Sequence, residues 1–191
     1  MDPRVERTHS AVRRATLQVL GHRGYSAFTV EAVAEEAGVA KSTIYRHWPT
    51  RLSLISDALE ALNRQPRLEL TGTARDQIAQ LLDHLVSAFS DSVLSACMPA
   101  LIEAAEHHHE VAEFLHGYSS RRRQTLVNII EDGIAAGELP QNLDSELTAL
   151  ALIGPIIYRR TMTPTPFSRD DIEPILDIVL GPPLAARPGS Q

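Results

Sequence analysis

The 191-residue chain has a single cysteine and no long apolar run. With Cys97 alone, no intramolecular disulfide can form. Cys97 stands in an apolar stretch without a neighbouring basic residue that would favour the thiolate, so we interpret it as a packing residue rather than a redox sensor. The longest apolar run, residues 149–158, is too short to span a bilayer and contains Pro155. The start of the sequence lacks the apolar run of a signal peptide, so we expect a cytoplasmic protein.

Patterns that would indicate strands or an enzyme are also missing. β-Branched and aromatic residues never alternate at period two for long enough to predict a strand, and no phosphate-binding glycine loop or serine-nucleophile elbow occurs. His107, His108 and His109 suggest a metal site, but adjacent histidines on a helix point in different directions. The zinc-protease pattern would also need histidine where Glu113 stands. We therefore expect no enzyme, no metal and no cofactor.

Basic residues are outnumbered overall, with 18 Lys and Arg against 24 Asp and Glu and a net charge of −6. This balance argues against a protein that coats DNA indiscriminately. Residues 1–55, however, hold eight basic residues against five acidic ones, whereas residues 56–191 hold ten against nineteen. A basic first third on an acidic body predicts one DNA-facing end.

Two short helices joined by a glycine turn are predicted within residues 24–54. Thr29 is an N-cap candidate, and an apolar stripe at helical spacing then ends at Gly38, where glycine tolerates a left-handed conformation. In the second helix, which we expect from about Ala40, Ile44 and Trp48 face inward. The other face carries a row of hydrogen-bond donors: Lys41, Ser42, Thr43, Tyr45, Arg46 and His47. Pro49 then stops this helix and Thr50 caps the next. This is the pattern of a helix-turn-helix, whose second helix enters the DNA major groove.

These residues resemble the TetR-type (tetracycline-repressor) family of transcriptional regulators. The matching elements are Arg23-Gly24-Tyr25, Thr29-Val30, Val33-Ala34, Ala37-Gly38-Val39, Lys41, Thr43-Ile44-Tyr45, Trp48-Pro49 and Thr50. The strong match covers about residues 8–58. Arg51 stands where the family usually has lysine, and it keeps the expected role of a phosphate contact. Trp48 stands where phenylalanine is common, and it keeps the expected role of a large aromatic side chain that fills the core.

We therefore predict that the second helix reads DNA and that two flanking residues hold phosphates at helix starts, where amide donors favour anions. The predicted DNA-binding residues are Thr29, Lys41, Ser42, Thr43, Tyr45, Arg46, His47 and Arg51. The expected fold is all-α with about nine helices: an N-terminal three-helix DNA-binding domain and a C-terminal antiparallel helical domain for ligand binding and dimerisation. The first helix is expected from Arg4 to Gly21, with Gly21 and Gly24 ending it. The predicted domains are residues 1–64 and 65–181, with a disordered tail over 182–191.

The segment Leu147–Tyr158 is apolar nearly all round, and a helix without a polar face must be covered on every side. The simplest cover is its copy in a second subunit across a two-fold axis, and the resemblance implies such a four-helix bundle. The predicted dimer interface consists of Leu147, Leu150, Ile153, Gly154, Ile157, Ile172, Ile175, Leu176 and Val179.

The resemblance also implies a small-molecule effector that enters the C-terminal helices and changes the spacing of the two DNA-reading heads. The candidate pocket residues are Leu85, Phe89, Leu101, Phe114, Tyr118 and Tyr158, although each could equally be plain core. The sequence thus predicts a homodimeric repressor that a largely apolar ligand releases from a palindromic operator. Two alternatives stay open: an activator or a regulator controlled by a protein partner, and an all-helical enzyme, which would need a polar cleft that we do not see.

Overall fold

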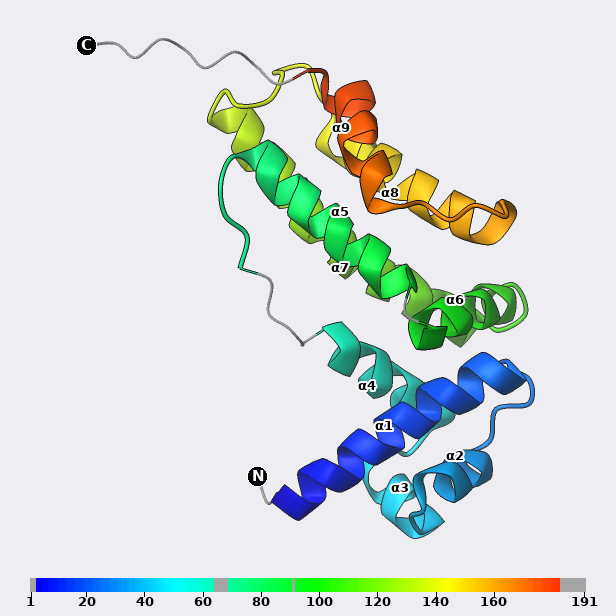
Figure 1. The fold of residues 1–191 in the computed structure, drawn as a ribbon. Helices are drawn as coiled ribbons and strands as arrows, with labels where there is room; N and C mark the ends of the chain where they lie inside the picture. Colours follow the sequence, from blue (N-terminus) through cyan, green and yellow to red (C-terminus); the bar gives the residue numbers. More distant parts are fainter. Residues whose placement is uncertain (1–2, 64–68, 91, 183–191) are drawn as a thin grey trace. The chain divides into compact units, whose positions relative to one another are not determined.

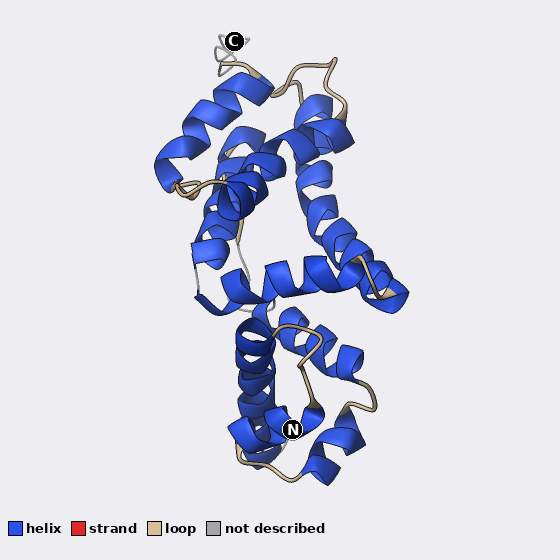
Figure 2. Ribbon diagram, turned by 90° about the vertical axis from the view of Figure 1, so that its right-hand side faces the viewer, coloured by secondary structure: helices blue, strands red, loops and turns tan. Residues whose placement is uncertain are grey.

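The structure, a computed structural model, describes residues 3–63, 69–90 and 92–182. Over these residues the chain forms nine α-helices and one short 3-10 helix, and no strand (Figures 1 and 2). The helices form two compact units. The first unit comprises Met1–Leu68 and Ser90–Tyr118, and the second comprises Glu69–Phe89 and Ser119–Gln191. The predicted all-α fold is confirmed.

The first unit contains α1 (Pro3–Arg23), α2 (Val30–Ala37), α3 (Lys41–His47), α4 (Arg51–Asn63), α6 (Ser92–Ala105) and the beginning of α7 (His109–Ala135). Helix α1 packs against α2, α4 and α6. The side chains buried between them include Leu20, Phe28, Ile44, Leu54, Ile55, Leu59 and Leu101.

Three predicted helix boundaries of the first unit have the expected chemistry. The Thr29 hydroxyl accepts from the Ala32 amide at 3.1 Å and caps α2. Gly38 ends α2 with φ 66°, in the left-handed region that glycine adopts without strain. The Thr50 hydroxyl accepts from the Ser53 amide at 3.0 Å at the start of α4.

Of the two glycines predicted to end the first helix, Gly21 instead lies inside α1, which continues to Arg23. A Cβ atom at Gly21 would lie 2.9 Å from the Cβ atom of Ala96 on α6. Gly21 is therefore a point of close approach between two helices, and Gly24, with φ 71°, follows the helix end.

The second unit contains α5 (Ala74–Ser90), the rest of α7, α8 (Ser145–Met162), the 3-10 helix η1 (Arg169–Asp171) and α9 (Ile172–Leu180). The core of this unit is formed by side chains of all four α-helices, among them Ile78, Leu82, Leu126, Ile130, Leu152, Ile156 and Leu176. Ser168 and Asp171 form a capping box ahead of α9.

Helix α8 has one covered side and one exposed side. Thr148, Ala149, Leu152 and Ile156 are buried. On the exposed side Leu147, Leu150, Tyr158 and Met162 are 66%, 50%, 61% and 71% exposed. Because these residues recur at helical spacing, they form an apolar stripe that the described part of the chain leaves uncovered.

The remaining predicted interface residues differ in burial. Gly154 is exposed, whereas Ile153, Ile157, Ile175 and Val179 are half-buried. Ile172 and Leu176 are 6% and 0% exposed and belong to the core of their own unit. Both contribute to the core of the second unit, and their part in a dimer interface stays a prediction.

The contacts divide the chain differently from the sequence boundary that we placed after residue 64. Residues 90–118, expected in the C-terminal domain, group with the N-terminal helices because α6 packs on α1. The predicted tail from residue 182 lies almost entirely outside the described residues. No single described helix is long and apolar enough to cross a membrane, although α5 and the described part of α6, taken as a bent pair, meet the length and composition required.

Candidate nucleic-acid interface

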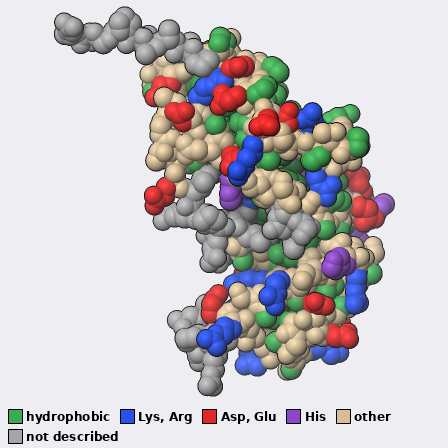
Figure 3. Space-filling model, viewed as in Figure 1, with side chains coloured by type: hydrophobic (Ala, Val, Ile, Leu, Met, Phe, Trp, Pro, Cys, Tyr) green, Lys and Arg blue, Asp and Glu red, His purple; other side chains and the backbone are tan. Residues whose placement is uncertain are grey.

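Helix α3 presents a polar face because two apolar residues fix its rotation. Ile44 is fully buried and Trp48, directly after the helix, is 5% exposed. The side chains between and before them point outward: Lys41, Ser42, Tyr45, Arg46 and His47 are exposed, and Thr43 is half-buried. Figure 3 shows basic side chains exposed on the first unit. The six residues predicted from the sequence therefore lie on one short helix, and five of them are exposed.

Lys41 has an acidic neighbour in the protein itself. Its Nζ atom lies 3.1 Å from Oε1 of Glu31 on α2, and both side chains are 56% exposed. The hydrogen bonds that Glu31 accepts from the backbone and from Lys41 lower the pKa of its carboxyl group. This surface ion pair links the two helices of the helix-turn-helix on their solvent side.

Arg51, the predicted phosphate contact, is exposed but is held by two neighbours. Its Cζ atom lies 4.9 Å from the ring centroid of Tyr25, and its Nη1 atom donates to the Phe28 carbonyl oxygen at 3.4 Å. Phe28 directly precedes Thr29, so Arg51 lies beside the residue that caps α2. The sequence indicated Arg51 and Thr29 separately, and the fold brings them to neighbouring helix starts.

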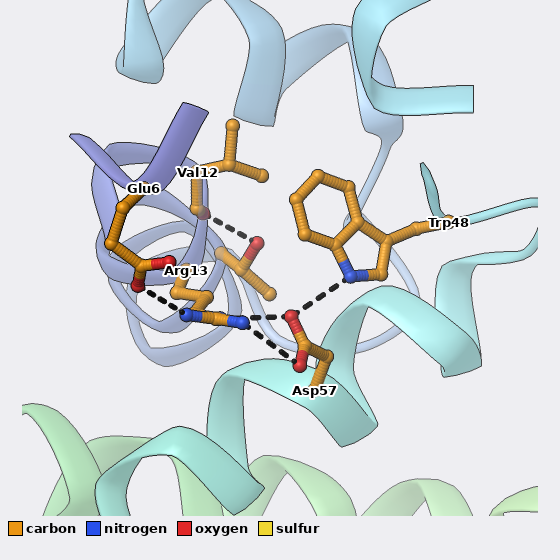
Figure 4. A network of polar contacts seen from close by, with 6 residues as sticks. Glu6, Val12, Arg13, Trp48 and Asp57 are labelled. Atoms are coloured by element: carbon orange, nitrogen blue, oxygen red, sulfur yellow. Dashed lines mark hydrogen bonds and ion pairs between the residues drawn. The ribbon is translucent and has the colours of Figure 1, made fainter. Parts of the chain in front are cut away.

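A polar network fixes the end of α3 to α1 and α4 (Figure 4). The Asp57 carboxylate on α4 accepts from the Trp48 indole Nε1 at 2.9 Å and from Arg13 Nε and Nη2 at 2.8 and 3.3 Å. Glu6 lies 3.4 Å from Nη1 of the same arginine, and the pair with Asp57 raises the pKa of Arg13. Sequence analysis missed this network, because residues 13, 48 and 57 show no common pattern.

His47, one of the predicted reading residues, packs against another histidine of the same unit. Its ring centroid lies 4.6 Å from that of His9 on α1 in an edge-on arrangement, and His9 lies 4.9 Å from Trp48. The Nε2 atom of His9 is buried and has no hydrogen-bond partner among the residues that the structure describes. Burial lowers the pKa of His9, and the nearby His47 and Arg13 lower it further, so the neutral form is favoured.

The predicted effector residues belong to both units. In the first unit Leu101 and Tyr118 are buried, and the rings of Phe114 and Tyr118 lie 5.9 Å apart. In the second unit Leu85 and Phe89 pack against the core. Tyr158, at 61% exposure, lies instead on the exposed stripe of α8.

His107, His109 and Cys97 have the surroundings of ordinary surface and core residues. His107 lies 3.8 Å from Glu103 and His109 lies 3.3 Å from Glu113, each one helical turn away. Among the described residues no group of three or more His, Cys, Asp or Glu is placed to hold a metal ion. Cys97 is buried, its Sγ atom donates to the Leu17 carbonyl oxygen at 3.1 Å, and burial raises its pKa to about 12. A thiol of this kind is inert.

Two sequence-family models match the chain. The model described as "Bacterial regulatory proteins, tetR family" matches residues 12–58, and the model described as "Tetracyclin repressor-like, C-terminal domain" matches residues 68–179. The uncharacterized HTH-type transcriptional regulator YdeS of Bacillus subtilis is 32% identical over 84% of this chain and 82% of its own length. The DNA-binding transcriptional repressor TetR of Mycobacteroides abscessus is 32% identical over 56% of this chain and 57% of its own. Among solved structures, the transcriptional regulator FadR of Bacillus subtilis in complex with stearoyl-CoA superposes with a TM-score of 0.72 at 20% identity, covering 90% of this chain and 98% of FadR.

Proposed function

The chain belongs to the TetR family and is a helix-turn-helix transcriptional regulator, and we propose that it acts as a homodimeric repressor of a palindromic operator. The exposed polar face of α3 carries the proposal. Side chains near the start of a recognition helix meet base edges, so Lys41, Ser42, Thr43, Tyr45 and Arg46 are the reading residues. Thr29 and Arg51 contact phosphates on either side. His47, which packs against α1, makes the smaller contribution.

The dimer is the part of the proposal that the exposed stripe of α8 supports. Leu147, Leu150, Tyr158 and Met162 face solvent in the single chain, and an added Cβ atom at Gly154 would meet no described residue within 4 Å. Apolar patches of this kind mark association sites. A second copy placed by a two-fold axis would cover the stripe with itself. The half-sites would then lie about one helical turn, roughly 34–36 Å, or a multiple of it apart.

Binding to a randomised duplex library tests the operator proposal. The full-length chain should enrich a palindrome, and its affinity should fall steeply with salt, by a log–log slope of about −0.9 per phosphate neutralised. The Arg46→Ala variant should relax the sequence preference, whereas Arg51→Ala should weaken all sequences alike. A wild-type chain that enriches no sequence above background would refute the proposal.

Release by a small, largely apolar ligand completes the proposed function. Support comes from the large apolar side chains predicted to line the site and from FadR, a protein of the same fold in complex with stearoyl-CoA. A tenfold to hundredfold release needs about 1.4–2.7 kcal/mol of coupling between ligand and DNA. Long-chain acyl-CoA is the first probe, with coenzyme A alone as its control. Phe114→Ala should change release by the probe while leaving operator affinity without it nearly intact. If apolar and aromatic probes leave operator affinity unchanged, control by a protein partner becomes the better explanation.

A further inference from the structure

The ring of Tyr25 lies in the connection between α1 and α2 and is only 2% exposed. Two side chains from distant parts of the sequence lie against it. The Cζ atom of Arg51, at the start of α4, is 4.9 Å from the ring centroid. The ring of His108, directly before α7, has its centroid 5.2 Å from that of Tyr25, with an angle of 52° between the planes. All three residues belong to the first unit, and the Tyr25 ring contacts both Arg51 and His108.

Arg51 needs such support because a free arginine side chain has many rotamers, and each ordered side chain costs entropy when a partner binds. A guanidinium over an aromatic face is attracted by the quadrupole of the ring. The hydrogen bond from Arg51 to the Phe28 carbonyl oxygen, at 3.4 Å, fixes the same group from a second direction. The cation is therefore ordered before DNA arrives, and less rotamer freedom is lost on binding.

The contact does not depend on a charge on Tyr25. Burial raises the pKa of the Tyr25 hydroxyl; Arg51 opposes this effect, and the nearby Glu110 adds to it. The phenol is therefore neutral at physiological pH, and the aromatic face alone attracts the guanidinium. Phenylalanine at this position would keep that face, whereas leucine would keep the apolar character and lose the face.

We propose that Tyr25 is a positioning residue for the phosphate contact of Arg51, and that His108 braces the Tyr25 ring from the turn between α6 and α7. This inference rests on the proposed role of Arg51 in operator binding. It assigns a DNA-binding task to a buried aromatic residue that would otherwise count as core. It also connects the turn before α7 with the start of α4 through one ring.

The test measures how operator affinity of the full-length chain depends on salt. Arg51→Ala should make the log–log slope shallower by about 0.9, the effect of one phosphate contact, so that the loss of affinity between 50 and 200 mM salt shrinks about 3.5-fold. Tyr25→Leu should give the same change, and the double variant should give no more than Arg51→Ala alone. Tyr25→Phe should keep the wild-type slope. A general loss of folded protein would lower the active fraction without changing the slope.

The proposed role of His108 is tested by separate variants. His108→Ala should make the slope shallower in the wild-type background and have no effect in the Tyr25→Leu background. His107→Ala is the matched control, because this neighbouring histidine lies near Glu103 instead, and it should leave the slope unchanged.

Three results would overturn the inference. A wild-type slope in Tyr25→Leu, while Arg51→Ala is shallower, would show that Arg51 needs no positioning. Additive changes in the double variant would show that the two residues act independently. An unchanged slope in Arg51→Ala would show that Arg51 makes no phosphate contact, but it would not contradict the regulator function. A wild-type chain that binds no operator would refute that function as well.

Discussion

Replacing Asp57 by alanine should destabilise the first unit, because one carboxylate serves donors from α1 and from the end of α3. The Trp48 indole N–H, on a residue that is 5% exposed, would lose its acceptor at 2.9 Å. Leaving a buried donor unpaired costs about 1–3 kcal/mol. The side chains of the Arg13–Asp57 pair are 19% and 23% exposed. The cost of breaking this pair should therefore lie between that of a surface pair, about 0–1 kcal/mol, and that of a fully buried pair, about 3–5 kcal/mol.

These two losses share one side chain and are not additive, so we expect Asp57→Ala to lower the free energy of unfolding by about 2–4 kcal/mol. Asp57→Asn keeps an oxygen acceptor for the indole and removes the charge. Its cost should be roughly half as large, about 1–2 kcal/mol. The difference between the two variants separates the hydrogen bond of Trp48 from the ion pair of Arg13.

Urea unfolding followed by fluorescence measures this directly, since Trp48 is the only tryptophan in the chain and reports on the contact itself. The control is Asp177→Ala in the second unit, followed by far-ultraviolet circular dichroism because Trp48 lies in the first unit. There Arg75 keeps Glu173 and the Gly181 carbonyl oxygen as partners, so the cost should stay below about 1 kcal/mol. A loss below about 1 kcal/mol for Asp57→Ala, or equal losses for alanine and asparagine, would refute the reasoning.

Four further predictions follow from single contacts. The pKa of His9 is lowered from 6.5 in the folded protein, so its neutral form stabilises the fold above pH 6.5, and this stabilisation is lost as the pH falls from 6.5 toward the lowered pKa. In urea titrations from pH 8 to 5, the free energy of unfolding of His9→Leu should therefore depend less on pH than that of the wild type. Gly21→Val should destabilise by about 1–3 kcal/mol in thermal melts, because its Cβ would lie 2.9 Å from a side-chain carbon of α6; unchanged stability would contradict the close approach. Leu150→Glu should give folded monomers in sedimentation, and a folded wild-type monomer at micromolar concentration would remove the dimer. Glu31→Gln should raise operator affinity by releasing Lys41, and equal binding by both proteins would show that the ion pair does not compete.

The elements that sequence analysis predicted correctly are those fixed by local chemistry. Thr29, Gly38 and Thr50 mark helix boundaries through contacts within three or four residues, and such contacts leave a signal in the sequence. The outward face of α3 was predictable for the same reason, because Ile44 and Trp48 alone decide its rotation.

Long-range packing explains the rest. Gly21 was interpreted as a helix end because glycine commonly ends helices, whereas its role depends on Ala96, 75 positions later, which no local pattern indicates. In the same way Ile172 and Leu176 show the apolar spacing of an interface as well as that of a core. In the structure both belong to the core of the second unit, which the spacing alone does not indicate.

Lys41, at the start of the reading helix α3, and Arg51, at the start of α4, are held in ways that have opposite consequences for DNA binding. Lys41 is paired with Glu31, a carboxylate that repels phosphate and competes for the same ammonium group. Arg51 lies on the neutral ring of Tyr25, which attracts the cation without opposing an anion on its other side. The ion pair between Lys41 and Glu31 is exposed and weak, so it can break when DNA binds. Breaking it costs free energy, which offsets part of what the contact between Lys41 and DNA contributes. Arg51 keeps its support while it binds. Forming its proposed contact with DNA therefore costs Arg51 less than it costs Lys41, although both are single positive charges at the same surface.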